Sequence, residues 1–353
     1  MADLRTLQSR QRGVSLIELM IAVTIGLLML TALASMYMGA SNNNRELARS
    51  SRQIEDGRYA LQTITDDIAL AGYLGYFTNP VAPAVLPDPC EQNDMTTIRA
   101  GSALAVQGYD APATVPAPLS GCLGDAEHVS GTDILVVRRA DSNVTASGAL
   151  LSSEIYLQAN SDINNSSNPV IALGSLGNFP LLMKDNTTLA PIRKYHVHIY
   201  YVAPCSVPSG GGSNCTGAGD DNGNPIPTLK RLELALDSGG NRSWVVTPIA
   251  EGVEQLQIDY GVDSDGDGVP DGAFTTAPAS AADWANVVVM TLHLLVRNTE
   301  STQGYSDLKT YNLGLAGTLS STASGGTLAA GYKRKAYVAQ GRVVNTASRR
   351  ETP

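Results

Sequence analysis

The chain has few charged residues and no surplus of basic ones. Charged residues make up 16% of its 353 residues, below the quarter that is usual for a globular domain. The formal net charge is −9, and Arg5, Arg10 and Arg12 concentrate positive charge at the N-terminus. Because proteins bind nucleic acid largely by neutralising phosphates with Lys and Arg, this balance argues against nucleic acid as a partner. A second basic group lies near the C-terminus, and we expect ordinary solvated charge there: Lys333, Arg334, Lys335, Arg342, Arg349 and Arg350.

The sequence also lacks the motifs that mark common catalytic sites. It contains no Gly-rich phosphate loop, no nucleophile elbow and no evident Ser/His/Asp arrangement. An anchored hydrolase would need a catalytic constellation, and nothing in the sequence motivates one. We therefore predict that the protein is not an enzyme.

Cysteine is scarce, with four residues and no CxxC pair. The missing close-spaced thiolates and Cys/His clusters argue against a zinc site. The cysteines fall into two separated pairs, Cys90 with Cys122 and Cys205 with Cys215. An even count in an exported chain indicates disulfides, for which three connectivities are open. We favour the sequential pairing because each bond would close a loop rich in Gly, Pro or Ser, which stabilises a fold by about 2–4 kcal/mol.

A long apolar stretch near the N-terminus indicates a membrane anchor. The 22 residues from Leu19 to Ala40 carry no charge. As a helix they extend about 33 Å, enough to cross a hydrocarbon core of about 30 Å. An ordinary secretory signal has a shorter apolar region that ends at a small-residue cleavage site. The arginines before the stretch predict a cytoplasmic N-terminus and a translocated body.

Glu18 lies at the start of this stretch, where a charge needs a reason. A charged side chain near the centre of a membrane helix costs about 2.5–3.5 kcal/mol on insertion scales. Glu18 could stay solvated among the headgroups, or it could find a cationic partner on assembly. A buried carboxylate is tolerable where it meets an ammonium group in low-dielectric surroundings.

The segment Gly13-Val-Ser-Leu-Ile-Glu18-Leu resembles the class III signal of type IV pilins and type II secretion pseudopilins. In that signal a basic leader ends in Gly before a hydrophobic residue, and Glu is the fifth residue after the cleaved bond. The resemblance implies that a prepilin peptidase cleaves between Gly13 and Val14 and methylates the new amino group of Val14. It also implies that Glu18 pairs with the N-terminal amine of a neighbouring subunit. Val14 departs from the commoner Phe but keeps a hydrophobic residue at this position.

Beyond Ala40 the pattern changes to that of an amphipathic helix. The apolar residues that recur at helical spacing are Leu47, Ile54, Leu61, Ile64, Ile68 and Ala71. The polar side carries Arg45, Arg49, Arg52, Glu55, Asp56, Asp66 and Asp67. We predict one helix from about Leu16 to Ala71, with a membrane span at about residues 16–40 and a second half packed on a globular body. Glycines are weak points where such a helix could bend, and they stand at Gly26, Gly39 and Gly57.

The remainder of the chain predicts a β-rich body. Residues 73–130 are rich in Pro, Gly and Ala and are expected to be irregular. Strand patterns follow at 133–139, 154–158, 194–203, 228–236, 252–262 and 287–297. Few helical patterns lie between them, which disfavours a parallel α/β fold. We predict an α+β fold in which the long helix packs on an antiparallel sheet, divided into a leader (1–13), the helix (14–72), the irregular excursion (73–130) and the body (131–353).

Three stretches of the body resemble PilW-type minor pilins: IPTLKRLEL (226–234), IAEGVEQLQIDYGV (249–262) and VVMTLHLLVR (288–297). The resemblance implies a lollipop-shaped pilin fold and a role in priming or capping type IV pilus assembly. It implies as partners other minor pilins, the major pilin, the prepilin peptidase and the inner-membrane assembly machinery. The protein would cross the inner membrane once, with a periplasmic body, and then reach the pilus at the cell surface. A minor pseudopilin of type II secretion and a tip adhesin or DNA-binding pilin are the alternatives.

The stretch Asp263-Ser-Asp-Gly-Asp-Gly-Val-Pro-Asp271 is the sharpest local motif. It matches the front of an EF-hand-like calcium loop, in which Asp263, Asp265, Asp267 and Asp271 would supply carboxylates and Val269 a backbone carbonyl. The last loop position holds Phe274 in place of a bidentate Glu, and no helical pattern flanks the loop. A polar hairpin rich in Asp and Gly is the alternative. We expect Ca²⁺ as the one candidate cofactor.

His196 and His198 lie on one face of a predicted strand. No third metal ligand is evident near them in the sequence. We therefore expect a solvent-facing strand surface here and not a metal pair.

Overall fold

The computed structural model describes residues 13–162, 168–212 and 214–351. The chain forms two compact units that divide between Ser51 and Arg52, which we call the N-terminal unit and the C-terminal unit. The division falls within helix α1 (Leu16–Leu70), whereas the sequence predicted a boundary after residue 72. The predicted helix of residues 16–71 agrees with α1 to within one residue.

In the described chain, the N-terminal unit consists of a short segment without regular secondary structure and α1 as far as Ser51. Among the described residues, α1 is the one helix long and apolar enough to cross a membrane. None of the described residues in its most apolar 18-residue window is buried. This part of the chain therefore has the form that the sequence predicted for a membrane anchor.

The C-terminal unit combines the end of α1 with an antiparallel β body, which confirms the predicted α+β class. Its further helices are α2 (Met95–Gly101), α3 (Ala281–Ala285) and α4 (Val344–Arg350). Its strands are β1 (Val106–Tyr109), β2 (Ile134–Ala140), β3 (Ile155–Gln158), β4 (Val170–Leu173), β5 (Ile192–Ala203), β6 (Thr228–Leu236), β7 (Arg242–Glu251), β8 (Val253–Val262), β9 (Val287–Arg297), β10 (Thr310–Asn312), β11 (Thr318–Ser320) and β12 (Arg334–Arg342).

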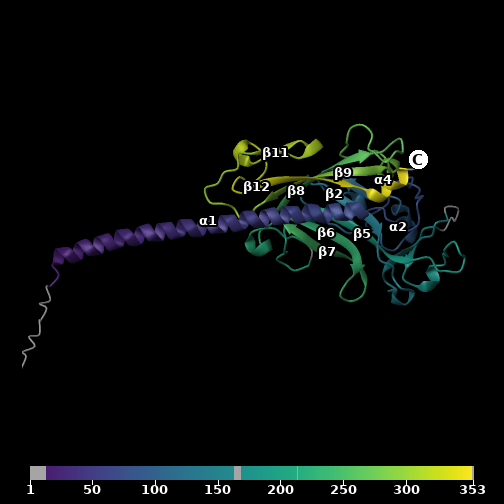
Figure 1. Ribbon diagram of the computed structural model, residues 1–353, viewed down its shortest axis with the longest axis horizontal. Coiled ribbons are helices and arrows are strands. Elements are labelled where there is room, and N and C mark those ends of the chain that lie inside the picture. The colour runs from purple at the N-terminus through teal and green to yellow at the C-terminus, as the bar shows by residue number, and fades with distance from the viewer. Residues whose placement is uncertain (1–12, 163–167, 213, 352–353) are drawn as a thin grey trace, which may run out of the picture. The chain divides into compact units, whose positions relative to one another are not determined.

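Two sheets make up most of the body. A 7-stranded antiparallel sheet has the order β1-β2-β5-β3-β4, with β6 paired to β5 and β7 paired to β6. A 3-stranded antiparallel sheet has the order β12-β9-β8, and β10 and β11 form a small ribbon. Figure 1 shows the last part of α1 between the β8, β9 and β12 sheet and strands β6 and β7.

The long strand β5 explains how the larger sheet is covered on both faces. Alternate residues of a strand point to opposite faces. Tyr200 and Val202 face a core that includes Ile64 and Ile68 of α1 together with residues of β8 and β9. The other set of residues from β5 joins a second core, which covers the opposite face: Tyr195, Val197, Ile199, Tyr201 and Ala203.

Residues 73–130, which the sequence predicted to be irregular, are more ordered than expected. They contain α2 and β1, and β1 pairs with β2 at the edge of the larger sheet. Most of the segment has no regular secondary structure, as predicted, and the sequence missed α2 and β1 because its buried apolar residues are widely spaced. Those that enter the second core are Leu74, Phe77, Ile98, Leu119 and Leu123.

A close contact fixes α1 on the smaller sheet. A Cβ atom at Gly57 would lie 2.5 Å from a ring carbon of Tyr337 in β12, so the ring packs directly on the helix backbone. One turn earlier, Gln53 Nε2 donates to the carbonyl oxygen of Val296 at 2.7 Å. Gly57 therefore permits close packing, whereas the sequence suggested a bend in the helix.

Candidate functional site

The peptide bond between Gly13 and Val14 lies in the non-helical segment ahead of α1. The side chain of Val14 is 73% exposed. Apart from Gly13 itself and its chain neighbours, no described atom lies within 4 Å of the position that a Cβ atom at Gly13 would take. The bond is thus outside the helix and exposed in the described structure.

Ser15 and Glu18 form a reciprocal cap at the start of α1. The backbone amide of Ser15 donates to Glu18 Oε2 at 2.9 Å, and the backbone amide of Glu18 donates to Ser15 Oγ at 3.2 Å. This is a capping box, which satisfies amides that the first helical turn leaves unpaired. The sequence analysis considered a solvated Glu18 and an assembly role and missed this cap, although Ser-x-x-Glu before an apolar run is its signature.

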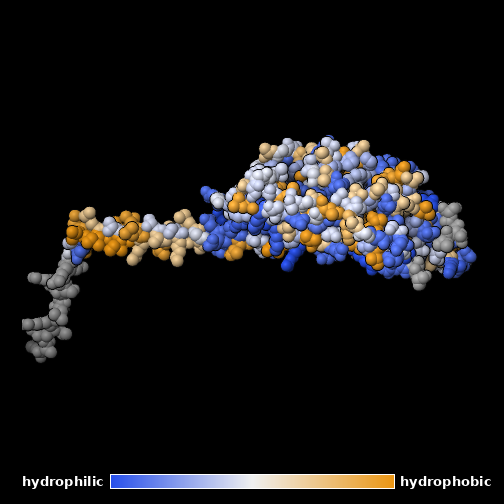
Figure 2. Space-filling model, turned by 90° about the horizontal axis from the view of Figure 1, so that it is seen from above, coloured by the Kyte–Doolittle hydropathy of each residue, from blue (hydrophilic) through white to orange (hydrophobic). Residues whose placement is uncertain are grey.

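Residues 16–40, which we call the first part of α1, present apolar side chains on all sides apart from Glu18 and a few small polar residues. Figure 2 shows this segment covered largely by hydrophobic residues. Its exposed large side chains are Leu16, Ile17, Leu19, Met20, Ile21, Val23, Ile25, Leu27, Leu28, Met29, Leu30, Leu33, Met36, Tyr37 and Met38. A helix that is apolar on every side requires a lipid or protein environment.

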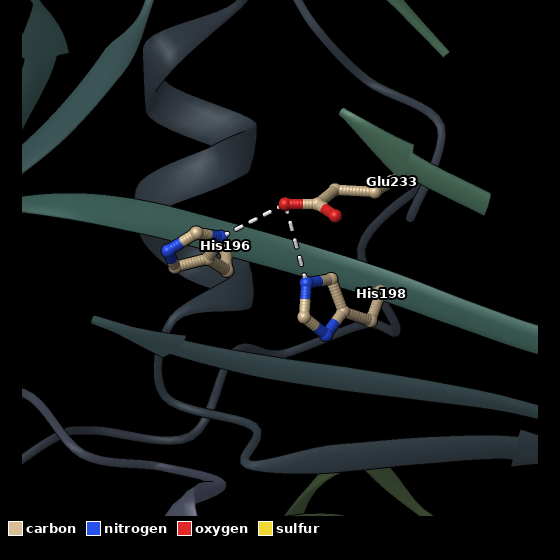
Figure 3. A group of neighbouring side chains, drawn as sticks. All are labelled: His196, His198 and Glu233. Carbon is tan, nitrogen blue, oxygen red and sulfur yellow. Dashed lines mark hydrogen bonds and ion pairs between the residues drawn. The ribbon is translucent and has the colours of Figure 1, made fainter. Parts of the chain in front are cut away.

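A polar cluster lies on the face of the larger sheet that α1 covers, and Figure 3 shows its centre. Strand pairing places His198 of β5 opposite Glu233 of β6. Glu233 Oε1 lies 3.1 Å from His196 Nδ1 and 3.4 Å from His198 Nε2, so one oxygen faces both rings. The three ligand-type atoms lie within 4.8 Å of one another.

Each ring also contacts a second carboxylate through its other nitrogen. His198 Nδ1 lies 2.6 Å from Asp67 Oδ2, and His196 Nε2 lies 3.4 Å from Asp141 Oδ2. Burial would raise the pKa of Asp67, but hydrogen bonds and charges from His198 and Arg139 outweigh burial and lower this pKa. The two histidines lower the pKa of Glu233 in the same way, again against the effect of burial.

The predictions for these residues need correction. The sequence predicted a solvent-facing surface at the two histidines, yet His198 is only 2% exposed. It also placed Asp67 on the polar side of the helix, yet Asp67 is buried and pairs with Arg139 at 2.7 Å. The predictions were wrong because Glu233 is distant in sequence, and because the sheet supplies partners that make burial of charge tolerable.

The aspartate-rich loop after β8 brings three carboxylates together. Asp263, Asp265 and Asp267 each place one oxygen within 4.8 Å of the others. Asp271 instead accepts hydrogen bonds from Ser264 and from the amide of Asp265. Arg350 Nε donates to Asp263 Oδ2 at 2.6 Å, so a guanidinium group already neutralises the most buried of the carboxylates. Burial would raise the pKa of Asp263, but Arg350 and two backbone amides lower it overall.

The basic group near the C-terminus is not uniformly solvated, contrary to expectation. Arg334 is 4% exposed and pairs with Glu254 at 2.6 Å and with Asp307 at 3.1 Å. Burial lowers the pKa of Arg349 to about 10. Arg334 and Arg349 are therefore tied to the fold, whereas Lys335 and Arg342 are exposed as expected.

The cysteines form two disulfides, Cys90–Cys122 and Cys205–Cys215. These are the sequential pairs that the sequence favoured. Asp220 lies near the second bond, but the two sulfur atoms are joined and do not serve as metal ligands.

Comparison with known families adds two matches. Residues 215–345 match the family described as Type IV Pilus-assembly protein W. Residues 8–34 match the prokaryotic N-terminal methylation motif, which spans Gly13, Val14 and Glu18. No curated protein matches the chain.

Proposed function

We propose that this chain, a type IV pilin of the PilW type and a minor pilin of pilus assembly, is cleaved between Gly13 and Val14 and enters the filament through α1. The observation that carries the proposal is the exposed, non-helical Gly13–Val14 junction directly ahead of a capped helix whose apolar residues are uncovered. Such a helix suits a chain that first resides in lipid and then packs among other helices.

The test of processing is the intact mass and N-terminal sequence of the protein from cells with and without active prepilin peptidase. We expect a mature form that begins at methylated Val14, and only the uncleaved chain when the peptidase is inactive. Cleavage after the apolar stretch, or no cleavage at all, would contradict the proposal. A Ser35→Ala variant is the matched control, because it changes α1 away from the junction.

Glu18 has a second role in this proposal. The capping box holds its carboxylate at the start of the helix, where the helix dipole favours negative charge. In the filament it would pair with the methylated amine of a neighbouring subunit. The test is a Glu18→Gln variant, which keeps a side chain able to accept the hydrogen bond from Ser15. We expect Glu18→Gln to be processed and capped normally but to enter filaments poorly; normal entry would contradict this role.

The proposal extends to location and partners. The matches and the apolar helix support membrane anchoring and contact with other pilus components. We propose a periplasmic body, a single inner-membrane span and later transfer to the surface pilus. Its partners would be other minor pilins, the major pilin, the prepilin peptidase and the inner-membrane machinery. Site-specific cross-linking from the first part of α1 in cells tests these contacts.

We propose no catalytic role, since both matched families are structural and assembly proteins. The pseudopilin of type II secretion is not favoured, because the body matches a pilus-assembly family. Among pilins, we place the protein in a priming or tip complex. Deletion should lower the number of pili per cell without changing the fibre, and unchanged piliation would contradict that placement.

The loop of Asp263, Asp265 and Asp267 supports a further proposal, that it binds Ca²⁺. Converging carboxylates suit a hard cation, but Arg350 competes for Asp263. Val269 and Asp271 would complete the site. Calcium titration of the full chain in detergent micelles tests this proposal, with terbium luminescence as the readout. We expect Asp265→Asn to weaken binding and Arg350→Gln to strengthen it, and equal affinity in all variants would contradict the site.

A further inference from the structure

We infer that His196, His198 and Glu233 form a binding site for a divalent transition-metal ion, best matched by Zn²⁺. The two histidines lie outside the residues that match a known family, and Glu233 lies within them. The inference does not depend on a role in pili.

The separation of the ligand atoms fits zinc. Zinc binds histidine nitrogen and carboxylate oxygen at about 2.0–2.2 Å, so the ligand atoms of a tetrahedral site lie about 3.3 Å apart. The Oε1 atom of Glu233 lies 3.1 Å and 3.4 Å from the ring nitrogens of His196 and His198. Two histidines and one carboxylate are a common zinc ligand set, and they leave a fourth position for water.

The second observation is that, in the described chain, Nε2 of His198 makes an ion pair but no hydrogen bond. The side chain of His198 is 3% exposed, and among the described residues Nε2 has no hydrogen-bond partner. A buried polar atom that makes no hydrogen bond destabilises the fold, so a ligand that it can bind is favoured. Nε2 points toward Glu233 Oε1 within ion-pair distance, and a metal ion between them would satisfy it.

The surrounding residues hold the ligands in the orientation that a metal needs. Histidine ligands commonly donate their other N–H group to a carboxylate, which fixes the ring and its tautomer. Asp67 takes this position for His198, and Asp141 takes it for His196. Arg231 contacts Oε2 of Glu233 at 3.1 Å and leaves Oε1 to face the rings.

The charge balance also favours a cation. The cluster holds three carboxylates, Asp67, Asp141 and Glu233, against the guanidinium groups of Arg139 and Arg231. With neutral histidines the carboxylates are in excess, and either a proton or a metal ion corrects this. His196 and Glu233 are 12% and 18% exposed, so one side of the site is open to an incoming ion.

Sequence reasoning argued against zinc because it found no closely spaced ligands beyond the histidine pair. Strand pairing supplies Glu233 from a distant part of the chain, and α1 supplies Asp67. A bound ion would therefore join β5 and β6 directly, and it would reach α1 through Asp67. We assign the site a structural role in holding α1 on the larger sheet.

The test uses the full chain in detergent micelles, purified without a polyhistidine tag and stripped with a chelator. Zinc titration by calorimetry and elemental analysis should give one Zn²⁺ per chain. Cobalt substitution should give the visible absorption of a four- or five-coordinate ion. At a hundredfold excess over the dissociation constant, zinc should raise the unfolding temperature by about 4 °C. Failure to bind one ion per chain would overturn the inference.

Variants distinguish zinc binding at this site from zinc binding at other histidines and carboxylates of the chain. We expect His196→Ala, His198→Ala and Glu233→Gln each to weaken zinc binding by about 100-fold or more. Asp67→Asn should weaken it by about 10- to 100-fold, as changes to the partners of metal-bound histidines do. His293→Ala is the matched control, because His293 is buried beside a single carboxylate, Asp259. Asp263→Asn is a second control, which removes a ligand of the aspartate-rich loop.

Each variant is compared with wild type in its metal-free form by circular dichroism. Glu233→Gln preserves side-chain shape and is the variant most expected to fold. A folded Glu233→Gln that binds zinc as tightly as wild type would overturn the site. Loss of binding in His293→Ala or Asp263→Asn, with binding kept in the three ligand variants, would do so as well.

Discussion

The two parts of α1 belong to one continuous helix but meet different surroundings. The six buried residues of α1 lie between Gln53 and Ile68. The first part, by contrast, exposes a long series of large apolar side chains in the described chain. Helical structure is the same in both parts, so the difference comes from which side chains find partners within the chain.

This difference shows where each part obtains its stability. Ile64 and Ile68 bury their surface inside the C-terminal unit, and Asp67 has charged partners there. Leu27 and Leu28 are 57% and 70% exposed, and their burial must come from lipid or from other helices. The C-terminal unit should therefore fold on its own contacts, while the N-terminal unit depends on its environment.

The largest expected effect comes from removing a core side chain. Ile64→Ala should lower the free energy of unfolding by about 2–5 kcal/mol, because it leaves a cavity in a well-packed core. Leu28→Ala is the matched control and should leave this free energy unchanged. Both tryptophans, Trp244 and Trp284, lie in the C-terminal unit, so their fluorescence during denaturant unfolding in micelles reports on that unit. If Ile64→Ala and Leu28→Ala lowered the free energy of unfolding equally, the two parts of α1 would not differ in where they obtain their stability.

A charge in the first part of α1 should affect membrane insertion and leave the stability of the C-terminal unit unchanged, which is the reverse of Ile64→Ala. Leu28→Arg should impair membrane insertion, with a cost of about 2.5–3.5 kcal/mol near the helix centre. The fluorescence-monitored unfolding of the C-terminal unit should not change. The readout is the share of the chain in the membrane fraction of cells. Val338→Arg on the exposed side of β12 is the control, since its charge stays in water; membrane loss in this control would show a general expression defect.

The glycines of α1 offer a third contrast. Gly57→Ala should destabilise the C-terminal unit by about 1–3 kcal/mol, because the added methyl group collides with Tyr337. At Gly26, apart from the neighbouring backbone of the helix itself, no described atom lies within 4 Å of the added methyl group. Gly26→Ala should therefore strengthen the helix by about 0.5–1 kcal/mol. Thermal unfolding for Gly57→Ala and amide exchange for Gly26→Ala measure the two effects, and a stabilised Gly57→Ala would contradict the close packing.

The helix start should respond to a smaller change. Ser15→Ala removes one half of the capping box and should weaken the first turn by about 1 kcal/mol. We expect faster hydrogen exchange at the amide of Glu18. Ser35→Ala is the control, because Ser35 Oγ donates only to a carbonyl oxygen within the helix. Unchanged exchange in Ser15→Ala would mean that the cap does not hold in micelles.

The sequence predicted those elements that a local pattern of apolar and polar residues marks. Strands β6 and β9 agree with the predicted ranges, because alternating apolar residues mark them clearly. Strand β7 was missed, since it lies at the sheet edge, is only partly buried and contains Pro248. Strand β12 was missed because its charged residues suggested a solvated basic stretch. The contact of Glu233 with the histidines depends on strand pairing across distant residues, which no local pattern contains.

The pH dependence of stability should be the smallest effect, and it belongs to the C-terminal unit alone. Burial would lower the pKa of His198, but Asp67 and Glu233 outweigh burial and raise it above 6.5. A raised pKa in the folded state stabilises the protein below about pH 6.5, and the contribution is lost as pH rises through the folded-state pKa. Asp67 and Glu233 have lowered pKa values, so their contribution persists at neutral pH and is lost only in acid. The unfolding temperature of the metal-free chain should therefore fall from pH 6 to pH 8.5.

Two variants with opposite expectations test the origin of that fall. Burial lowers the pKa of His128, so His128 contributes stability that grows as pH rises through 6.5. His198→Gln should flatten the decline between pH 6 and pH 8.5, and His128→Gln should steepen it. Zinc should also flatten the wild-type decline, because the ion replaces the proton that neutral His198 has lost. His198→Gln leaves His128 in place, so a change in the decline in that variant reports on His198. A decline that is the same in wild type and in His198→Gln would show that the charge network around His198 does not set the pH response.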